Sequence, residues 1–220
     1  MRDGLMRNAT PHRAAKKKRG RTRTAAHDDK RLEIMERCAD LFDSGGYHRA
    51  TMQMLADEVG LGKPTLYHYF PSKTDILFAI HQKHIAALIE GLNSEQRRGS
   101  SPQQMLIHAC RDILEEIAHH PGYVRAFFEH YGELEGPKRA EIRARRQEYF
   151  DKICDIIRSG IDSGTFRKCD VEVTALGFLG MCSWAYQWYP PMVEKVPPGK
   201  LAPSPRHHIC ERCHCRFRIG

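Results

Sequence analysis

The sequence lacks any run of about 18 apolar residues, the minimum for a transmembrane helix, and no apolar stretch follows its first positive residues. These absences argue against a membrane span and a secretory signal, so we expect a cytoplasmic protein. Its eight cysteines should then stay reduced. Five of them lie in segments of helical pattern, where we interpret them as small buried hydrophobic residues: Cys38, Cys110, Cys154, Cys169 and Cys182.

Sequence motifs of common enzymes are also missing. We find no Ser-His-Asp spacing, no phosphate-binding glycine loop and no His-Glu-x-x-His pair. We therefore predict neither an enzyme nor a bound cofactor. No segment alternates apolar and polar residues as a half-buried strand does, which favours an all-α fold.

Positive charge is concentrated at the N-terminus. The chain has 35 Lys and Arg residues against 27 Asp and Glu, a net charge of +8. Residues 1–26 hold nine cations and one anion, so this short stretch carries the whole excess. It has no hydrophobic periodicity, and we predict a disordered basic arm that favours an anionic partner. A solubilising leader or a wrongly chosen start codon would look the same.

Helical periodicity begins near Lys30 and continues to about Tyr189. Glycine, proline and serine separate a three-helix unit from five longer segments, which are predicted to be helical: residues 73–92, 102–119, 122–134, 137–163 and 171–189. We expect an N-terminal helix-turn-helix domain at residues 27–72. A larger helical bundle should follow at residues 73–197.

The segment from Thr51 to Lys73 has the pattern of a helix-turn-helix: a short amphipathic helix capped by Thr51, a glycine-containing turn, and a second short helix. Four apolar residues would form the shared core of the two helices: Val59, Leu61, Leu66 and Phe70. The second helix then presents Lys63, Thr65, Tyr67 and His68 to solvent, where they can donate to phosphates or base edges. Ser72 would cap the next helix.

This segment resembles the signature of the tetracycline-repressor (TetR) family of transcription regulators. The matching positions are Val59 and Gly60 in the turn, the Tyr67 and Phe70 pair, and Lys73 at the start of the connecting helix. The resemblance covers about residues 30–80. Pro64 departs from the pattern, because the family often has a small polar residue there, and this could alter which bases are read.

The resemblance implies a role for each of seven residues in DNA binding. Lys63, Pro64 and Thr65 would face the major groove, Tyr67, His68 and Lys73 would bind the phosphate backbone, and Thr51 would place its hydroxyl or amide on a phosphate. Tyr67 could instead be partly core, and His68 could be merely solvated. If Lys73 binds a phosphate, replacing it should flatten the salt dependence by about one counterion.

The resemblance also implies a homodimeric repressor that binds palindromic double-stranded operator DNA near the nucleoid and is released by a small effector. By its position in the family, the segment 171–189 is the best candidate for a helix of the dimer interface. Trp184, Trp188 and Tyr189 resemble the end of this helix in regulators of fatty-acid and sterol catabolism, which makes a CoA thioester the first candidate effector. Burial of both tryptophans is the alternative. We assign no effector-binding residue, and an efflux regulator that responds to a hydrophobic compound or a nonspecific nucleic-acid binder remain alternatives.

Residues 198–220 form an atypical tail in place of the final amphipathic helix of the family. Cys210 and Cys213 have half of a zinc-site spacing, but the second half is absent. We therefore assign no metal site, and a frameshifted or replaced terminus explains the abrupt change of pattern as well.

Overall fold

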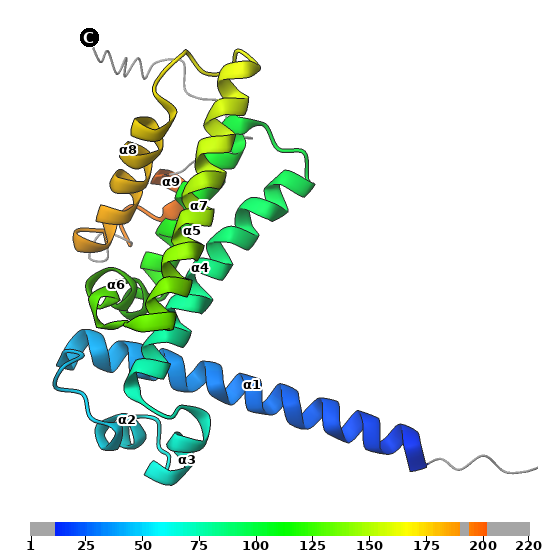
Figure 1. Cartoon of the computed structure of the whole chain (residues 1–220), viewed down its shortest axis with the longest axis vertical. Coiled ribbons are helices and arrows are strands. Elements are labelled where there is room, and N and C mark those ends of the chain that lie inside the picture. The colour runs from blue at the N-terminus through cyan, green and yellow to red at the C-terminus, as the bar shows by residue number, and fades with distance from the viewer. Residues whose placement is uncertain (1–11, 190–193, 202–220) are drawn as a thin grey trace, which may run out of the picture.

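The computed structural model describes residues 12–189 and 194–201, with side chains from Ala25 onward, and within these residues it contains helices and no strand. The predicted all-α fold, with a three-helix N-terminal domain and a larger helical domain behind it, is confirmed (Figure 1). The helices are α1 His12–Gly45, α2 Met52–Glu58, α3 Lys63–Tyr69, α4 Lys73–Arg97, α5 Pro102–His119, α6 Pro121–Glu129, α7 Gly136–Asp162, α8 Val171–Trp184 and α9 Pro198–Leu201.

Two hydrophobic clusters share the long helix α4. The first joins α1, α2 and α3 to the first turns of α4 and to one face of α6, and its members include Phe42, Leu66 and Phe70. The second lies between the remainder of α4 and helices α5 to α8. Because one rigid helix contributes to both clusters, a tilt of α4 moves both parts of the molecule.

Side-chain caps fix the starts of α2 and α4, the helices on either side of α3. The Thr51 hydroxyl accepts a hydrogen bond from the Met54 amide at 3.2 Å. The Ser72 hydroxyl accepts one from the Asp75 amide at 3.2 Å and donates to the Asp75 carboxylate at 2.6 Å. Both caps were predicted, and each satisfies an amide that the helix leaves without a partner.

The predicted disorder of residues 1–26 is wrong for residues 12–26, which form the first turns of α1. This stretch is rich in alanine, lysine and arginine, which are strong helix formers, and adding residues to an established helix requires no new nucleus. Figure 1 shows this half of α1 projecting away from the body of the protein. The basic segment is therefore a helical extension over much of its length; residues 1–11 lie outside the described residues.

Smaller differences concern the segment ends and one cysteine. The segments 122–134 and 171–189 each finish in a short 3₁₀ helix, at Tyr131–Glu133 and Ala185–Gln187. Cys169, expected to be buried, is exposed in the connection between α7 and α8.

In the described part of the chain, no helix is both long and apolar enough to cross a lipid bilayer. Most of the tail, including Cys210 and Cys213, lies outside the described residues.

Candidate DNA-binding surface and ligand cavity

Helices α2 and α3 pack together around the core that the sequence predicts. Leu66 is 0% exposed, Phe70 1% and Val59 3%, while Leu61 is partly buried against them. Gly60 takes the left-handed conformation at φ +66°, and the amide of Leu61 then donates to the Ala56 carbonyl at 2.9 Å. This turn sets the angle between the two short helices.

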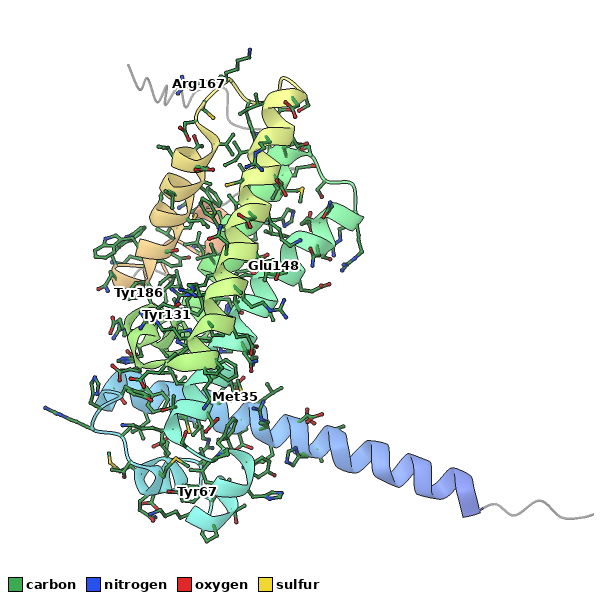
Figure 2. The ribbon with its side chains drawn as sticks, viewed as in Figure 1. Met35, Tyr67, Tyr131, Glu148, Arg167 and Tyr186 are labelled. Carbon is green, nitrogen blue, oxygen red and sulfur yellow. The ribbon has the colours of Figure 1, made fainter. Side chains whose placement is uncertain are left out.

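The opposite face of α3 points into solvent. Lys63, Pro64, Thr65 and His68 are exposed, and Tyr67 is 44% exposed. Figure 2 shows Tyr67 at the α2–α3 end of the molecule, far from Tyr131. Burial of Tyr67, the alternative interpretation, therefore does not apply in this chain.

Two further side chains lie beside this face. Tyr69 is partly buried, and its ring stacks on His27 of α1 with centroids 4.6 Å apart. Met54 of α2 is 42% exposed. Thr51 is exposed beside it, and its hydroxyl can still donate to an incoming phosphate while it accepts from the Met54 amide.

Lys73 binds backbone groups of its own chain. Its Nζ donates to the carbonyl oxygens of Tyr47 at 3.0 Å, Ala50 at 3.2 Å and His48 at 3.4 Å, and it lies 4.6 Å from the centre of the Tyr47 ring. A lysine ammonium has three donors, and all three are used here. In the DNA-free chain the side chain therefore holds the α1–α2 turn against the start of α4, and its contact with a phosphate stays a prediction.

We expect Lys73→Ala to lower the free energy of unfolding by about 1–3 kcal/mol, because the turn carbonyls lose a charged donor. The slope of operator affinity against salt should stay unchanged. Urea unfolding and gel shifts across salt measure the two quantities, with the exposed Lys63→Ala as the matched control for stability. Unchanged stability together with a flatter salt slope would restore the phosphate role.

A cavity of about 170 Å³ that is partly open to solvent lies in the second domain, lined by residues of α4, α5, α6, α7 and α8. Its walls are mostly apolar. They consist of the side chains of Ile85, Leu88, Ile113, Phe127, Phe128 and Leu179, with His84, Arg146, Tyr149 and Ser183 as polar members. A mostly apolar hollow with a few convergent polar groups is the usual form of a small-molecule site.

Arg146 is the cation of this cavity. Its Nη2 donates to the Phe127 carbonyl at 2.6 Å, and the guanidinium lies 4.0 Å from the centre of the Phe127 ring and 4.2 Å from that of Tyr131. Burial lowers the pKa of Arg146 to about 10, so it stays charged at neutral pH. Its Nε is buried and has no hydrogen-bond partner in the structure.

Other buried polar groups surround Arg146. The hydroxyl of Tyr149 has no hydrogen-bond partner, and neither has either ring nitrogen of His81. Burial lowers the pKa of His81 to about 3, so its ring is neutral. These residues are spread over two helices far apart in sequence, and sequence patterns alone could not group them.

The outer side of α8 forms an apolar face, defined here by its exposed side chains: Val173, Leu176, Met181 and Trp184, with Trp188 just beyond the helix. Their exposed fractions run from 45% to 67%. The alternative that both tryptophans are buried is therefore wrong for the single chain. Gly177 and Gly180 lie between them with open space above. Two small residues of the segment 171–189, Ala175 and Ala185, face the chain's own core instead.

The DNA-binding end is joined to the cavity through α6. A Cβ on Gly122 of α6 would lie 3.0 Å from the backbone of Ala39 in α1, so the two helices are in close contact there. Arg125 of α6 forms an ion pair with Asp43 of α1 at 2.6 Å. Since Phe127 and Phe128 on the same helix line the cavity, one short element touches both sites.

Two family models match the chain over more than half of its length. The model of bacterial regulatory proteins of the tetR family matches residues 34–80, and that of a tetracyclin repressor-like C-terminal domain matches residues 99–192. The first match contains the α2–α3 unit, and the second contains most of the cavity walls. The first match ends within α4, and the second begins just after that helix.

Individual relatives are regulators as well. The transcriptional activator FasR of Mycolicibacterium smegmatis is 28% identical over 68% of this chain and 69% of FasR. The repressor KstR2 of Mycobacterium tuberculosis is 25% identical over 74% of this chain and 83% of KstR2. The structure of AibR with isovaleryl coenzyme A and operator DNA has a TM-score of 0.65 and 27% identity, and the match covers 80% of this chain and 99% of AibR. With the exposed face of α3, these matches show that the chain is not an enzyme but belongs to the TetR family of DNA-binding transcriptional regulators.

Proposed function

We propose that the protein is a homodimeric repressor that binds a palindromic operator and is released by a small effector in the cavity. The observation that carries the proposal is the solvent-facing side of α3, held in place by a fully buried inner side. Lys63, Pro64 and Thr65 would enter the major groove, and Thr51, Tyr67 and His68 would contact phosphates. Because FasR is named an activator and KstR2 a repressor, the sign of regulation needs its own measurement.

Dimerisation is proposed from the apolar face of α8. A recognition helix of seven residues reads few base pairs, so two copies must bind half-sites about 34–36 Å apart. The side chains that define the apolar face of α8 are all apolar. This face can therefore pack against the same face of a second copy, as an interface between two identical chains requires. The open space at Gly177 and Gly180 would let the partner helix approach closely.

The effector is proposed to be an acyl-CoA thioester. AibR, a structural relative, was solved with isovaleryl coenzyme A, and a Bacillus subtilis relative is named a fatty acid metabolism regulator. The apolar walls of the cavity suit an acyl chain. The same walls would also suit a hydrophobic compound that induces an efflux system, which is the second candidate.

Release of DNA would follow from the position of α6. A ligand can change DNA affinity only by binding two arrangements of the dimer unequally. A ligand against Phe127 and Phe128 would displace α6, and α6 would displace α1 through the close contact at Gly122. Together with a tilt of α4, this would change the separation of the two α3 helices.

Selection of bound DNA from a random library tests the proposal. We expect the full chain to recover an inverted repeat with half-site centres one helical turn apart. Deleting residues 1–26 should keep that sequence preference, weaken binding to all sequences, and flatten the salt dependence, because it removes nine cations. A shortened chain that binds DNA but selects no sequence would identify a nonspecific binder instead.

A further inference from the structure

The polar groups of the cavity specify the chemistry of its ligand. We propose that the cavity binds a short hydrocarbon chain ending in a carboxyl-level carbonyl oxygen, which accepts hydrogen bonds from Arg146 and Tyr149. This inference rests on the proposed function, because it takes the cavity as the effector site. It favours carboxylic acids and their thioesters over alcohols as the effector, and it excludes plain hydrocarbons.

The need for an acceptor follows from two unpartnered donors on residues that line the cavity. The Nε of Arg146 can only donate, and the Tyr149 hydroxyl carries a proton; both are buried and have no protein partner. A buried polar group without a partner is costly, so a ligand that supplies an oxygen here gains more than the same contact would give in water. The positive charge of the guanidinium favours the charged oxygens of a carboxylate most strongly, and the partly negative carbonyl oxygen of a thioester less strongly.

The size and walls of the cavity limit the remainder of the ligand. Drug-sized sites measure about 300–1,000 Å³. This cavity measures about 170 Å³, enough for a short acyl chain and too small for a whole coenzyme A. Leu88, Ile113 and Leu179 would surround the hydrocarbon. A free short-chain acid would lie entirely inside, whereas a thioester would leave its nucleotide part outside.

Arg146 also links occupancy to the helix that contacts α1. Its Nη2 donates to the Phe127 carbonyl near the C-terminal end of α6, whereas its Nε has no hydrogen-bond partner. A ligand oxygen that draws the guanidinium toward itself loosens the hold on Phe127. The residue that recognises the ligand is therefore the same one that fixes the position of α6.

Calorimetry on the full chain tests this chemistry with four probes: isovalerate, isovaleryl coenzyme A, coenzyme A alone, and 3-methylbutanol. We expect the acid or the thioester to bind at least about tenfold tighter than the alcohol and coenzyme A, since one charge-assisted hydrogen bond is worth about that factor. Tyr149→Phe keeps the shape of the wall and should weaken binding about tenfold; Arg146→Lys should weaken it further.

The matched control is Arg145→Lys. Arg145 is the neighbouring residue on α7, half exposed and paired with Glu148 at 3.0 Å on the outside of the helix. This variant should bind the ligand as the parent does. It should also bind operator normally without ligand, and the melting temperatures of all three variants separate a folding defect from lost recognition.

The outcomes distinguish this inference from the proposed function. If alcohol and acid bind equally, if Tyr149→Phe and Arg146→Lys leave affinity unchanged, or if no probe binds, the carbonyl assignment is overturned, even where another compound releases the operator. If the acid or thioester binds through Arg146 and Tyr149 but operator affinity does not change, the ligand chemistry stands and the effector role fails. Preference between acid and thioester identifies the natural source of the carbonyl.

Discussion

Leu176→Asp combined with Met181→Asp should convert the protein to a monomer and lower its affinity for a two-half-site operator by about 10²–10⁴-fold. Both side chains are more than 60% exposed on the apolar face of α8. In a symmetric interface each substitution occurs twice, so four carboxylates would have to be buried without partners. The large loss of affinity arises because a dimer binds its second half-site as an intramolecular event.

Analytical ultracentrifugation and gel shifts measure the two effects separately. Leu32→Asp is the matched control for oligomeric state, because Leu32 is an apolar residue of α1 that is 39% exposed and lies outside the apolar face of α8. That variant should remain a dimer. If the α8 double variant also remains dimeric with normal operator affinity, another surface joins the subunits and the role proposed for α8 is refuted.

Gly122→Val should lower operator affinity by about tenfold or more in the absence of any effector. Its new Cβ would lie 2.7 Å from the Asp40 carboxylate and 3.0 Å from the backbone of Ala39. Backbone atoms in a helix cannot move aside singly, so α6 and α1 must separate. Overpacking of this kind costs about 1–3 kcal/mol and displaces the helices in the way proposed for a bound ligand.

Gly132→Val is the control for Gly122→Val, because nothing lies within 4 Å of a Cβ at Gly132. It should bind operator as the parent does. Gel shifts with the selected operator give the affinities, and thermal unfolding shows whether each variant is folded. A folded Gly122→Val with normal operator affinity and normal release would show that the α1–α6 contact does not transmit the effector signal.

Much of the α2–α3 unit could be predicted from local sequence. The burial of Val59, Leu66 and Phe70 follows from helical spacing, and the left-handed turn at Gly60 follows from the conformational freedom of glycine. The outward position of Tyr67 follows from the same spacing. Local rules succeed here because helices of seven residues joined by a short turn leave few ways to bury the apolar side chains.

The role of Lys73 could not be predicted in the same way. Its position at the start of α4 suggested a free charge available to phosphate. In the structure, the α1–α2 turn brings three carbonyls to its ammonium, and these come from residues more than twenty positions earlier. A local pattern gives the face on which a side chain lies, but not which distant backbone groups fold against it.

The sequence by itself determined the helical fold, the helix-turn-helix and the family, because all three depend on spacing between residues near one another in the chain. Only the tertiary structure decided that Trp184 lies outside, that Arg146 and Tyr149 line a cavity with His84, and that α6 joins this cavity to α1. These features arise where helices distant in sequence meet. Which partners meet is settled by close contact across the whole core, and no local periodicity encodes it.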